Sequence, residues 1–142
     1  MIITEPKRVR KVGKAFRKHI PHIESVIFIE SSYFFGPNNP KKTIVHFKEN
    51  QAVYVFHNRD YQKFIKQKKM TKARFLEGIK ALHIEDWDRE YENIDVMDGE
   101  QWELIFHCSD LRRPIKIVGD NDFPPTFKKL QQLMKIDLNN KA

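Results

Sequence analysis

The chain has 142 residues, 12% of them aromatic, and its 26 Lys and Arg outnumber its 19 Asp and Glu to give a formal net charge of +7. This size and aromatic content predict one folded domain with its own core and argue against a disordered chain. The single cysteine excludes an intrachain disulfide, and without a long apolar run or a signal-peptide pattern we expect a cytoplasmic protein with no membrane partner.

The charges are gathered in three blocks. Residues 1–20 hold seven Lys or Arg and one acid, and residues 62–74 hold six basic residues and no acid. Residues 84–103 reverse the sign, with nine acids and Arg89 as the one base. The acidic block could neutralise a basic block inside the fold or face an external partner, and the sequence leaves both alternatives open.

The N-terminal segment, residues 1–22, is predicted to be a basic arm or a short, frayed helix. Its apolar residues recur roughly at helical spacing, but Gly13 and Pro21 weaken a helix. We expect the rest of the chain, residues 23–142, to form a single α+β domain.

The first strand of that domain is expected from Ile23 to Phe35. Ile27 and Ile29 are assigned to one face together with Ile23, while Val26 and Phe28 point to the other. Apolar side chains on both faces favour a central position in the sheet. After the turn signal of residues 36–40, two short strands follow at Thr43–Lys48 and Ala52–Phe56, which completes a three-stranded antiparallel meander.

Two helices are predicted to cover the sheet. After a polar, basic loop or helical turn at 59–70, Thr71 is a fair N-cap for a helix over about 71–83. Its apolar stripe comprises Phe75, Leu76, Ile79 and Leu82. The second helix, over about 124–138, is expected to be capped by Asp122 with a proline in its first turn.

Between these helices the pattern predicts a C-terminal hairpin. Trp102, Leu104, Phe106 and Cys108 alternate toward the core, and the second strand carries Ile115 and Ile117 inward. Ile105 breaks the alternation, which predicts that the outer face of the sheet is partly covered as well. The predicted class is therefore α+β, with an antiparallel sheet of a meander plus a hairpin under two helices.

One stretch carries a pattern that is recognisable beyond this chain. Its elements are W…Y…DG-x-x-W-x-L, then G-x-N-x-[FY]-P and an aromatic helix, and they correspond to Trp87, Tyr91, Asp98, Gly99, Trp102, Leu104, Gly119, Asn121, Phe123, Pro124 and Phe127. Over roughly residues 75–133 the chain resembles a group of small, uncharacterised bacterial proteins, mostly from Gram-positive species. The resemblance implies a shared fold and carries no catalytic residue.

The same residues also have a structural interpretation. Asp98-Gly99 predicts a turn in which the glycine takes positive φ and delivers Trp102 into the core. Gly119 to Asn121 predicts a strand-to-helix turn, and Trp87 and Tyr91 are expected to pack under the sheet.

Signatures of catalysis and of cofactor binding are missing from the sequence. It contains no G-x-G-x-x-G, H-E-x-x-H, G-x-S-x-G or C-x-x-C motif. His19 and His22 straddle Pro21 without a third ligand nearby, and the acids at 85–92 lack the glycine spacing of a calcium loop. Cys108 is expected in the core, with His107 on the opposite face. We therefore expect no cofactor, no metal and no catalytic residue.

Two functional hypotheses remain. The first is a non-enzymatic module that binds another protein, favoured by the missing motifs and the uneven charge. The second is binding to nucleic acid or another polyanion through the basic arm and the block at 63–74. Phe16, Tyr61 and Phe64 lie among the basic residues and could stack on bases. The basic side chains assigned to that second hypothesis are Lys7, Arg8, Arg10, Lys11, Lys14, Arg17, Lys18, Lys66, Lys68 and Lys69.

Overall fold

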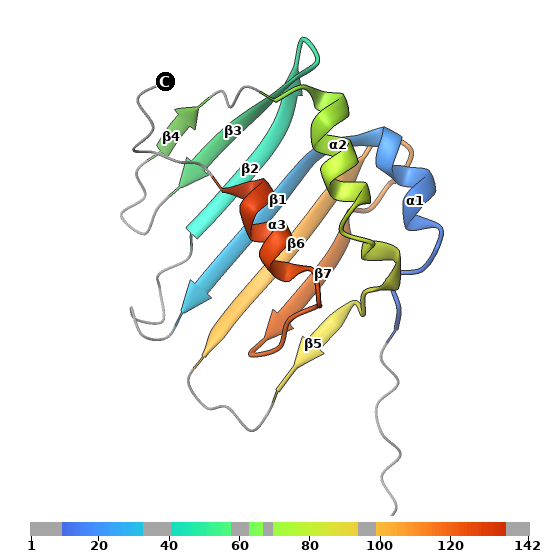
Figure 1. Cartoon of the computed structure of the whole chain (residues 1–142), viewed down its shortest axis with the longest axis vertical. Coiled ribbons are helices and arrows are strands. Elements are labelled where there is room, and N and C mark those ends of the chain that lie inside the picture. Colours follow the sequence, from blue (N-terminus) through green and yellow to red (C-terminus); the bar gives the residue numbers. More distant parts are fainter. Residues whose placement is uncertain (1–9, 33–40, 58–62, 67–69, 94–98, 136–142) are drawn as a thin grey trace, which may run out of the picture.

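The computed structural model describes residues 10–32, 41–57, 63–66, 70–93 and 99–135. These residues form a seven-stranded sheet with the strand order β4-β3-β2-β1-β6-β7-β5 (Figure 1). The strands are β1 (Ile23–Ser32), β2 (Lys41–Lys48), β3 (Gln51–His57), β4 (Lys63–Lys66), β5 (Glu90–Glu92), β6 (Glu100–Cys108) and β7 (Ile115–Asp120). The helices are α1 (Phe16–His19), α2 (Lys72–Lys80) and α3 (Phe127–Met134), with 3₁₀ turns η1 (Ile20–His22) and η3 (Ile84–Asp86).

The α+β class is confirmed, but the sheet is larger and less regular than predicted. β1 pairs with β2 on one side and with β6 on the other, so the meander and the hairpin form one continuous sheet. β5 pairs with β7 in parallel, which makes the sheet mixed rather than antiparallel. β4 adds an antiparallel edge strand where a loop or helical turn was expected. The central position predicted for the first strand is confirmed.

Both predicted covering helices exist, and both are shorter than expected. Thr71 caps α2 as predicted, since its hydroxyl oxygen accepts a hydrogen bond from the backbone N–H of Arg74 at 3.1 Å. The helix ends at Lys80, and the chain then turns through His83 in the left-handed region, with φ of 52°.

The cap of the second helix was assigned wrongly. α3 begins at Phe127 after the N-cap Thr126, and Pro124 and Pro125 precede it. The Asp122 carboxylate instead accepts from the adjacent N–H of Phe123. The predicted end at 138 lies outside the described residues. None of the described helices combines the length and the apolar character that crossing a bilayer requires.

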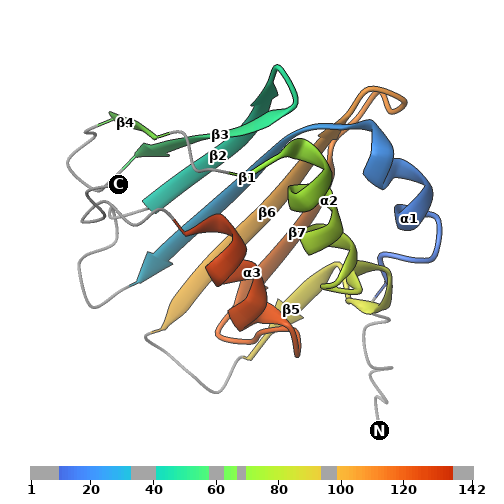
Figure 2. The same cartoon turned by 45° about the horizontal axis from the view of Figure 1, so that its top comes forward.

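The described part of the N-terminal segment, residues 10–22, packs into the domain instead of forming a separate arm. Val12, Phe16 and Ile20 are buried, and the rings of Phe16 and Phe106 meet edge to face with centroids 5.0 Å apart. The backbone N–H of Val12 donates to the carbonyl of Trp87 at 2.8 Å. This segment is therefore a third covering piece, at the edge of the helical layer (Figure 2).

The core lies between the helices and one face of the sheet. On β1 that face carries Ile23, Val26 and Phe28, because a bulge between Ile23 and Ser25 shifts the alternation. Ile23 was expected on the same face as Ile27 and Ile29, and the bulge is the reason that it is not. On β3, Tyr54 is fully buried, and its hydroxyl donates to the carbonyl of Leu133 at 2.7 Å, which ties the sheet to the end of α3.

Candidate functional site

The two basic blocks were the first candidate for a functional surface. Arg10, Lys11, Lys14, Arg17 and Lys18 lie on α1 and the chain leading to it, at the side of the molecule near β5 and η3. Lys66 lies on β4, the strand at the other edge of the sheet (Figure 1). Lys72 and Arg74 of the second block lie on α2, which contacts η1, so only this part of the block lies near the N-terminal segment. Lys7, Arg8, Lys68 and Lys69 lie outside the described residues, as does Tyr61.

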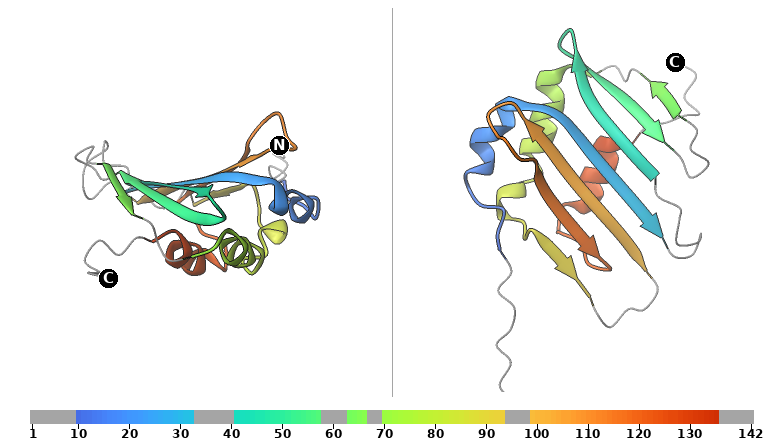
Figure 3. Two further views of the ribbon diagram at one scale, coloured as in Figure 1. Left: turned by 90° about the horizontal axis from the view of Figure 1, so that it is seen from above. Right: turned by 180° about the vertical axis from the view of Figure 1, so that it is seen from behind.

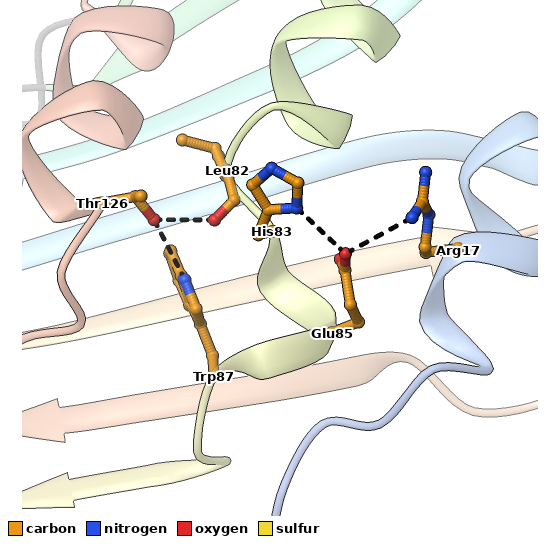
Figure 4. Close-up of polar contacts among 6 residues, drawn as sticks. All are labelled: Arg17, Leu82, His83, Glu85, Trp87 and Thr126. Atoms are coloured by element: carbon orange, nitrogen blue, oxygen red, sulfur yellow. Dashed lines mark hydrogen bonds and ion pairs between the residues drawn. The ribbon is translucent and has the colours of Figure 1, made fainter.

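Part of the basic N-terminal segment is neutralised inside the fold. The Nζ of Lys11 lies 2.8 Å from the carboxylate of Asp88, and this hydrogen bond raises the pKa of Lys11 above its ordinary value. Arg17 Nη1 lies 3.9 Å from Glu85 Oε1 (Figure 4). Of the two alternatives for the acidic block, internal neutralisation therefore holds for Asp88 and Glu85.

Glu85 is a buried carboxylate held by several partners. Its Oε1 also lies 3.2 Å from His83 Nδ1, on the side opposite Arg17 (Figure 4). Burial by itself would raise the pKa of Glu85, but hydrogen bonds from its own backbone N–H and from His83, together with the charge of Arg17, lower it below its ordinary value. Glu85 is thus held in its charged form.

The same corner contains the one group of potential metal ligands found among the described residues. Ligand atoms of His83, Glu85 and Asp86 all lie within 4.8 Å of one another. The guanidinium of Arg17 already faces Glu85, and a second cation there would be repelled. His19, considered for a metal with His22, instead pairs with Asp110 at 2.7 Å, which lowers the pKa of that carboxyl. Both groups therefore serve the structure.

The residues of the W…Y…W pattern form an aromatic cluster in the core. Trp102 is central: its ring lies 6.3 Å from Trp87, 5.9 Å from Tyr91 and 4.9 Å from Phe127, as measured between centroids. Its indole N–H donates to the carbonyl of Asp122 at 2.9 Å. Trp87 packs against the sheet as predicted, whereas Tyr91 is part of the sheet, on β5, and lies in one row with Gly119 and Trp102.

A second indole connects the ends of the two covering helices. Trp87 Nε1 donates to Thr126 Oγ1 at 3.0 Å, and that hydroxyl donates onward to the carbonyl of Leu82 at 2.8 Å (Figure 4). Thr126 sits at the N-terminus of α3, and Leu82 follows α2. One threonine hydroxyl therefore joins both helix ends to the aromatic cluster.

The two glycines of the pattern leave room for neighbouring side chains. The turn predicted at Asp98-Gly99 needs correction. Asp98 lies outside the described residues, and Gly99 does not adopt positive φ. A Cβ at Gly99 would overlap the side chain of Asn121, and one at Gly119 would overlap the indole of Trp102. Asn121 itself takes the left-handed conformation, with φ of 59°, as the chain leaves β7. Pro124 is buried after that turn.

A cleft of about 590 Å³ opens between α3 and the ends of β1, β2 and β3. Phe28, Thr43 and Met134 are buried parts of its wall, and Glu30 accepts a hydrogen bond from Gln131 at 2.9 Å. Burial raises the pKa of Glu30. Its polar lining consists of Glu30, Thr43, the lysines Lys41, Lys128 and Lys135, and two glutamines, with no His, Cys or Ser among the described lining residues.

The opposite face of the sheet has a different character. No described helix or strand lies over it, as the side and rear views in Figure 3 show. Its middle is aliphatic, and every member of this aliphatic group is half-buried by its neighbours in the sheet. We call this surface the open face; its aliphatic residues are Ile27, Ile29, Ile44, Val53, Val55, Ile105 and Val118.

The strand register arranges the open face in rows across the sheet. One row runs Val55, Ile44, Ile27, Ile105 and Lys116. The next runs His57, Lys42, Ile29, Glu103 and Val118. A third, at the other end, contains Val53, His46, Ser25 and His107. The face thus combines an aliphatic centre with Lys42 and Glu103, placed symmetrically about β1, and with Lys116 farther out on β7.

Two features of the sequence belong to this surface. The apolar residues on both faces of β1 predicted its central position, and the interruption of the pattern at Ile105 predicted that the outer face is partly covered. Among the described residues nothing covers it. A strand with aliphatic side chains on both faces has the same sequence pattern whether its second face packs within the chain or against another molecule, so the pattern does not distinguish the two.

Comparison with known proteins adds no relative: no family model, no curated protein and no solved structure matches the chain. The resemblance drawn from Trp87 to Phe127 therefore stays a prediction.

Proposed function

We propose that the protein is a non-enzymatic binding module that buries the open face of its sheet against a flat, aliphatic surface of a protein. The observation that carries the proposal is the group of seven half-buried Ile and Val side chains on five adjacent strands, with no described element over them. Contiguous apolar surface rimmed by polar residues is typical of sites at which proteins bind one another. Covering it gains about 25 cal/mol for each Å² of apolar surface removed from water.

The type of side chain favours a protein partner over nucleic acid. Proteins that bind single-stranded nucleic acid on a sheet present aromatic rings on which bases stack. The described side chains of the open face include no Phe, Tyr or Trp. Rigid β-branched side chains suit dense packing against another aliphatic surface, because they have few rotamers to lose.

The placement of the basic residues divides the surface that the nucleic-acid alternative needs. That hypothesis requires the N-terminal block and the 63–74 block to share one face. Lys66 on β4 lies at the far edge of the sheet from the N-terminal segment, and only Lys72 and Arg74, on α2, lie on an element that contacts it. Lys11 is in addition paired with Asp88, and Arg17 faces Glu85. These two cations are therefore less available to a phosphate backbone.

Site-specific photo-crosslinking tests the proposal. A photo-crosslinking residue replaces Ile44 at the centre of the open face, and the control carries it at Glu77, an exposed position on α2. In cells that make the protein, we expect a covalent adduct to a protein from position 44 and none from position 77. Equal crosslinking from both positions, or none from position 44, would refute the proposal.

A further inference from the structure

We infer that the partner is a second copy of this chain, packed face to face through the open face about a two-fold axis parallel to β1; this rests on the proposed function. Such an interface is isologous, so the same surface must be complementary to itself. The open face meets this condition in its apolar centre and in the charges on the two strands next to β1.

The axis determines which strands meet. A two-fold axis that lies between the sheets and runs along β1 places β1 over β1 of the other copy. It exchanges the two sides, so β2 lies over β6 of the partner and β3 over β7 of the partner, because these strands are equally far from β1. The sheets then pack with nearly aligned strands about 10 Å apart, as in a β-sandwich.

The aliphatic centre matches itself under this rotation. In the row of Ile27, each Ile27 meets Ile27 of the partner subunit. Ile44 on β2 meets Ile105 of the partner subunit on β6, and the reverse contact forms on the other side. The central contacts therefore pair aliphatic side chains only, which is the arrangement expected in the dry middle of an interface.

The charges on the two strands next to β1 match as well, and they select this axis; Lys116, at the rim on β7, keeps its own Glu103 as its neighbour. In the row of Ile29, Lys42 lies one strand to one side and Glu103 one strand to the other. The rotation places Lys42 opposite Glu103 of the partner subunit, twice in the dimer. Within its own chain, Glu103 pairs only loosely with Lys116 at 3.8 Å, and no ion pair of Lys42 forms among the described residues.

A two-fold axis that also lies between the sheets but runs perpendicular to β1 does not bring Lys42 opposite an acid. It would place each strand over its own copy, so Lys42 would meet only residues of β2. The described open-face residues of β2 are Lys42, Ile44, His46 and Lys48, and none of them is an acid. A lysine brought against these residues would lose water without gaining a partner for its charge, which is costly.

The size of the open face is sufficient for a specific contact. Five strands about 4.8 Å apart and about 20 Å long present roughly 500 Å² of flat surface on each copy. Two copies then bury about 1,000 Å² or more, the lower bound of a specific protein interface. Lys42 and Glu103 lie on strands next to β1, so the twist between packed sheets displaces them little.

Charge reversal followed by mixing tests the arrangement. Sedimentation velocity is measured for the full chain, for K42E, for E103K and for the double variant K42E/E103K. We expect a wild-type species of twice the 17.0 kDa chain mass, and at least about tenfold weaker association of each single variant, because each reversal turns two attractions into two repulsions. The double variant is expected to regain the wild-type association constant within about threefold.

The mixture of the two single variants is the decisive sample. A K42E chain offers two acids and an E103K chain two bases, so an equimolar mixture forms heterodimers in which both pairs attract each other. K80E and E77K, which reverse charges at exposed positions of α2, are the matched controls for net charge and are expected to dimerise like the wild type. Circular dichroism confirms that each variant is folded.

The outcomes separate this inference from the proposed function. A wild-type chain that stays monomeric at about 100 μM, or a dimer that neither single reversal weakens, would overturn the inference. If the adduct formed from position 44 contains a different protein, the proposed function stands and the second-copy inference fails. If the chain is monomeric and position 44 crosslinks no better than position 77, both fail.

Discussion

The indole of Trp102 on β6 lies against the backbone of Gly119, its direct partner in the register with β7. A Cβ at position 119 would occupy the space of the indole nitrogen and its neighbouring carbons. Trp102 has no room to yield, since it is 2% exposed and surrounded by the rings of Trp87, Tyr91 and Phe127. Gly119 is therefore required by the close approach of the indole, and not by its own backbone conformation.

Changing Gly119 to Ala is expected to lower the free energy of unfolding by about 2 to 3 kcal/mol, because overpacking a rigid core forces rings off their preferred positions. Urea unfolding followed by tryptophan fluorescence measures the loss. The matched control is Val118→Ala, the neighbouring residue on the open face, for which we expect a loss below about 1 kcal/mol. Equal losses in the two variants would contradict the steric argument.

Thr126 offers a test of the hydrogen bonds that join the two helices. Thr126→Val keeps the shape of the side chain but removes the acceptor for Trp87 Nε1 and the donor to the Leu82 carbonyl. An indole N–H left buried without a partner costs about 1 to 3 kcal/mol, and we expect the free energy of unfolding to fall by that amount. Thr126→Ser, which keeps the hydroxyl, is expected to retain most of the stability. If Thr126→Ser lowers the free energy of unfolding as much as Thr126→Val does, the lost packing of the methyl group and not the hydrogen bonds is the cause.

Glu85 is expected to make stability depend on pH. Its pKa is lowered in the folded protein, so its charged form contributes stability above the unfolded value of about 4.3, and that contribution disappears as the pH falls through the folded pKa. Glu85→Gln should therefore lower the free energy of unfolding by roughly 1 kcal/mol at pH 7. The difference from wild type should shrink below about pH 4. Asp86→Asn, an exposed neighbour, is the control and should change little at either pH.

Cys108 should react slowly with thiol reagents while the protein is folded. Burial is the largest cause that raises the pKa of its thiol to about 11, and the negative charges of Asp110 and Glu24 contribute less. Because only the thiolate is nucleophilic, we expect modification by a disulfide reagent at pH 8 to be about a hundredfold slower in the native protein than in urea. A native rate equal to the unfolded rate would show that the strand carrying Cys108 opens readily.

Much of the fold could be predicted because local patterns specify it. The alternation in β6 and the capping hydroxyl of Thr71 determine their elements through contacts close in sequence. Elements that depend on distant partners were missed. β5 comprises three residues, Glu90–Glu92, with no apolar pattern, and it exists because its backbone pairs with β7. The same limit applies to residues 10–22, whose core contacts with Trp87 and Phe106 are made across the chain.

The candidate site was harder to predict than the fold. Charge is conspicuous in a sequence, so the basic blocks attracted the functional hypotheses. The structure instead distributes those described residues over the N-terminal segment, α2 and the edge strand β4, and pairs Lys11 with Asp88. The open face is assembled from one or a few residues of each of five strands, and only the register shows that Lys42 and Glu103 flank Ile29. The interruption at Ile105 marks one of these strands, but no single motif spans the whole surface.

The open face can be distinguished from the core by its effect on stability. Ile44→Thr exchanges one β-branched side chain for another on the open face, and at about 1 μM protein we expect the free energy of unfolding to change by less than about 1 kcal/mol. Val45→Thr, the adjacent residue on the helix side, is the control. Val45 is 0% exposed, so the buried hydroxyl should cost about 1 to 3 kcal/mol.

Raising the protein concentration then separates association from folding. A dimer that forms only between folded chains is stabilised by mass action, so the urea midpoint of the wild type should rise between about 1 and 100 μM. Ile44→Thr should lose most of this rise, because Ile44 lies where β2 meets β6 of the partner subunit, while Val45→Thr should keep it. A midpoint independent of concentration in the wild type would mean that the open face contributes nothing to association between copies.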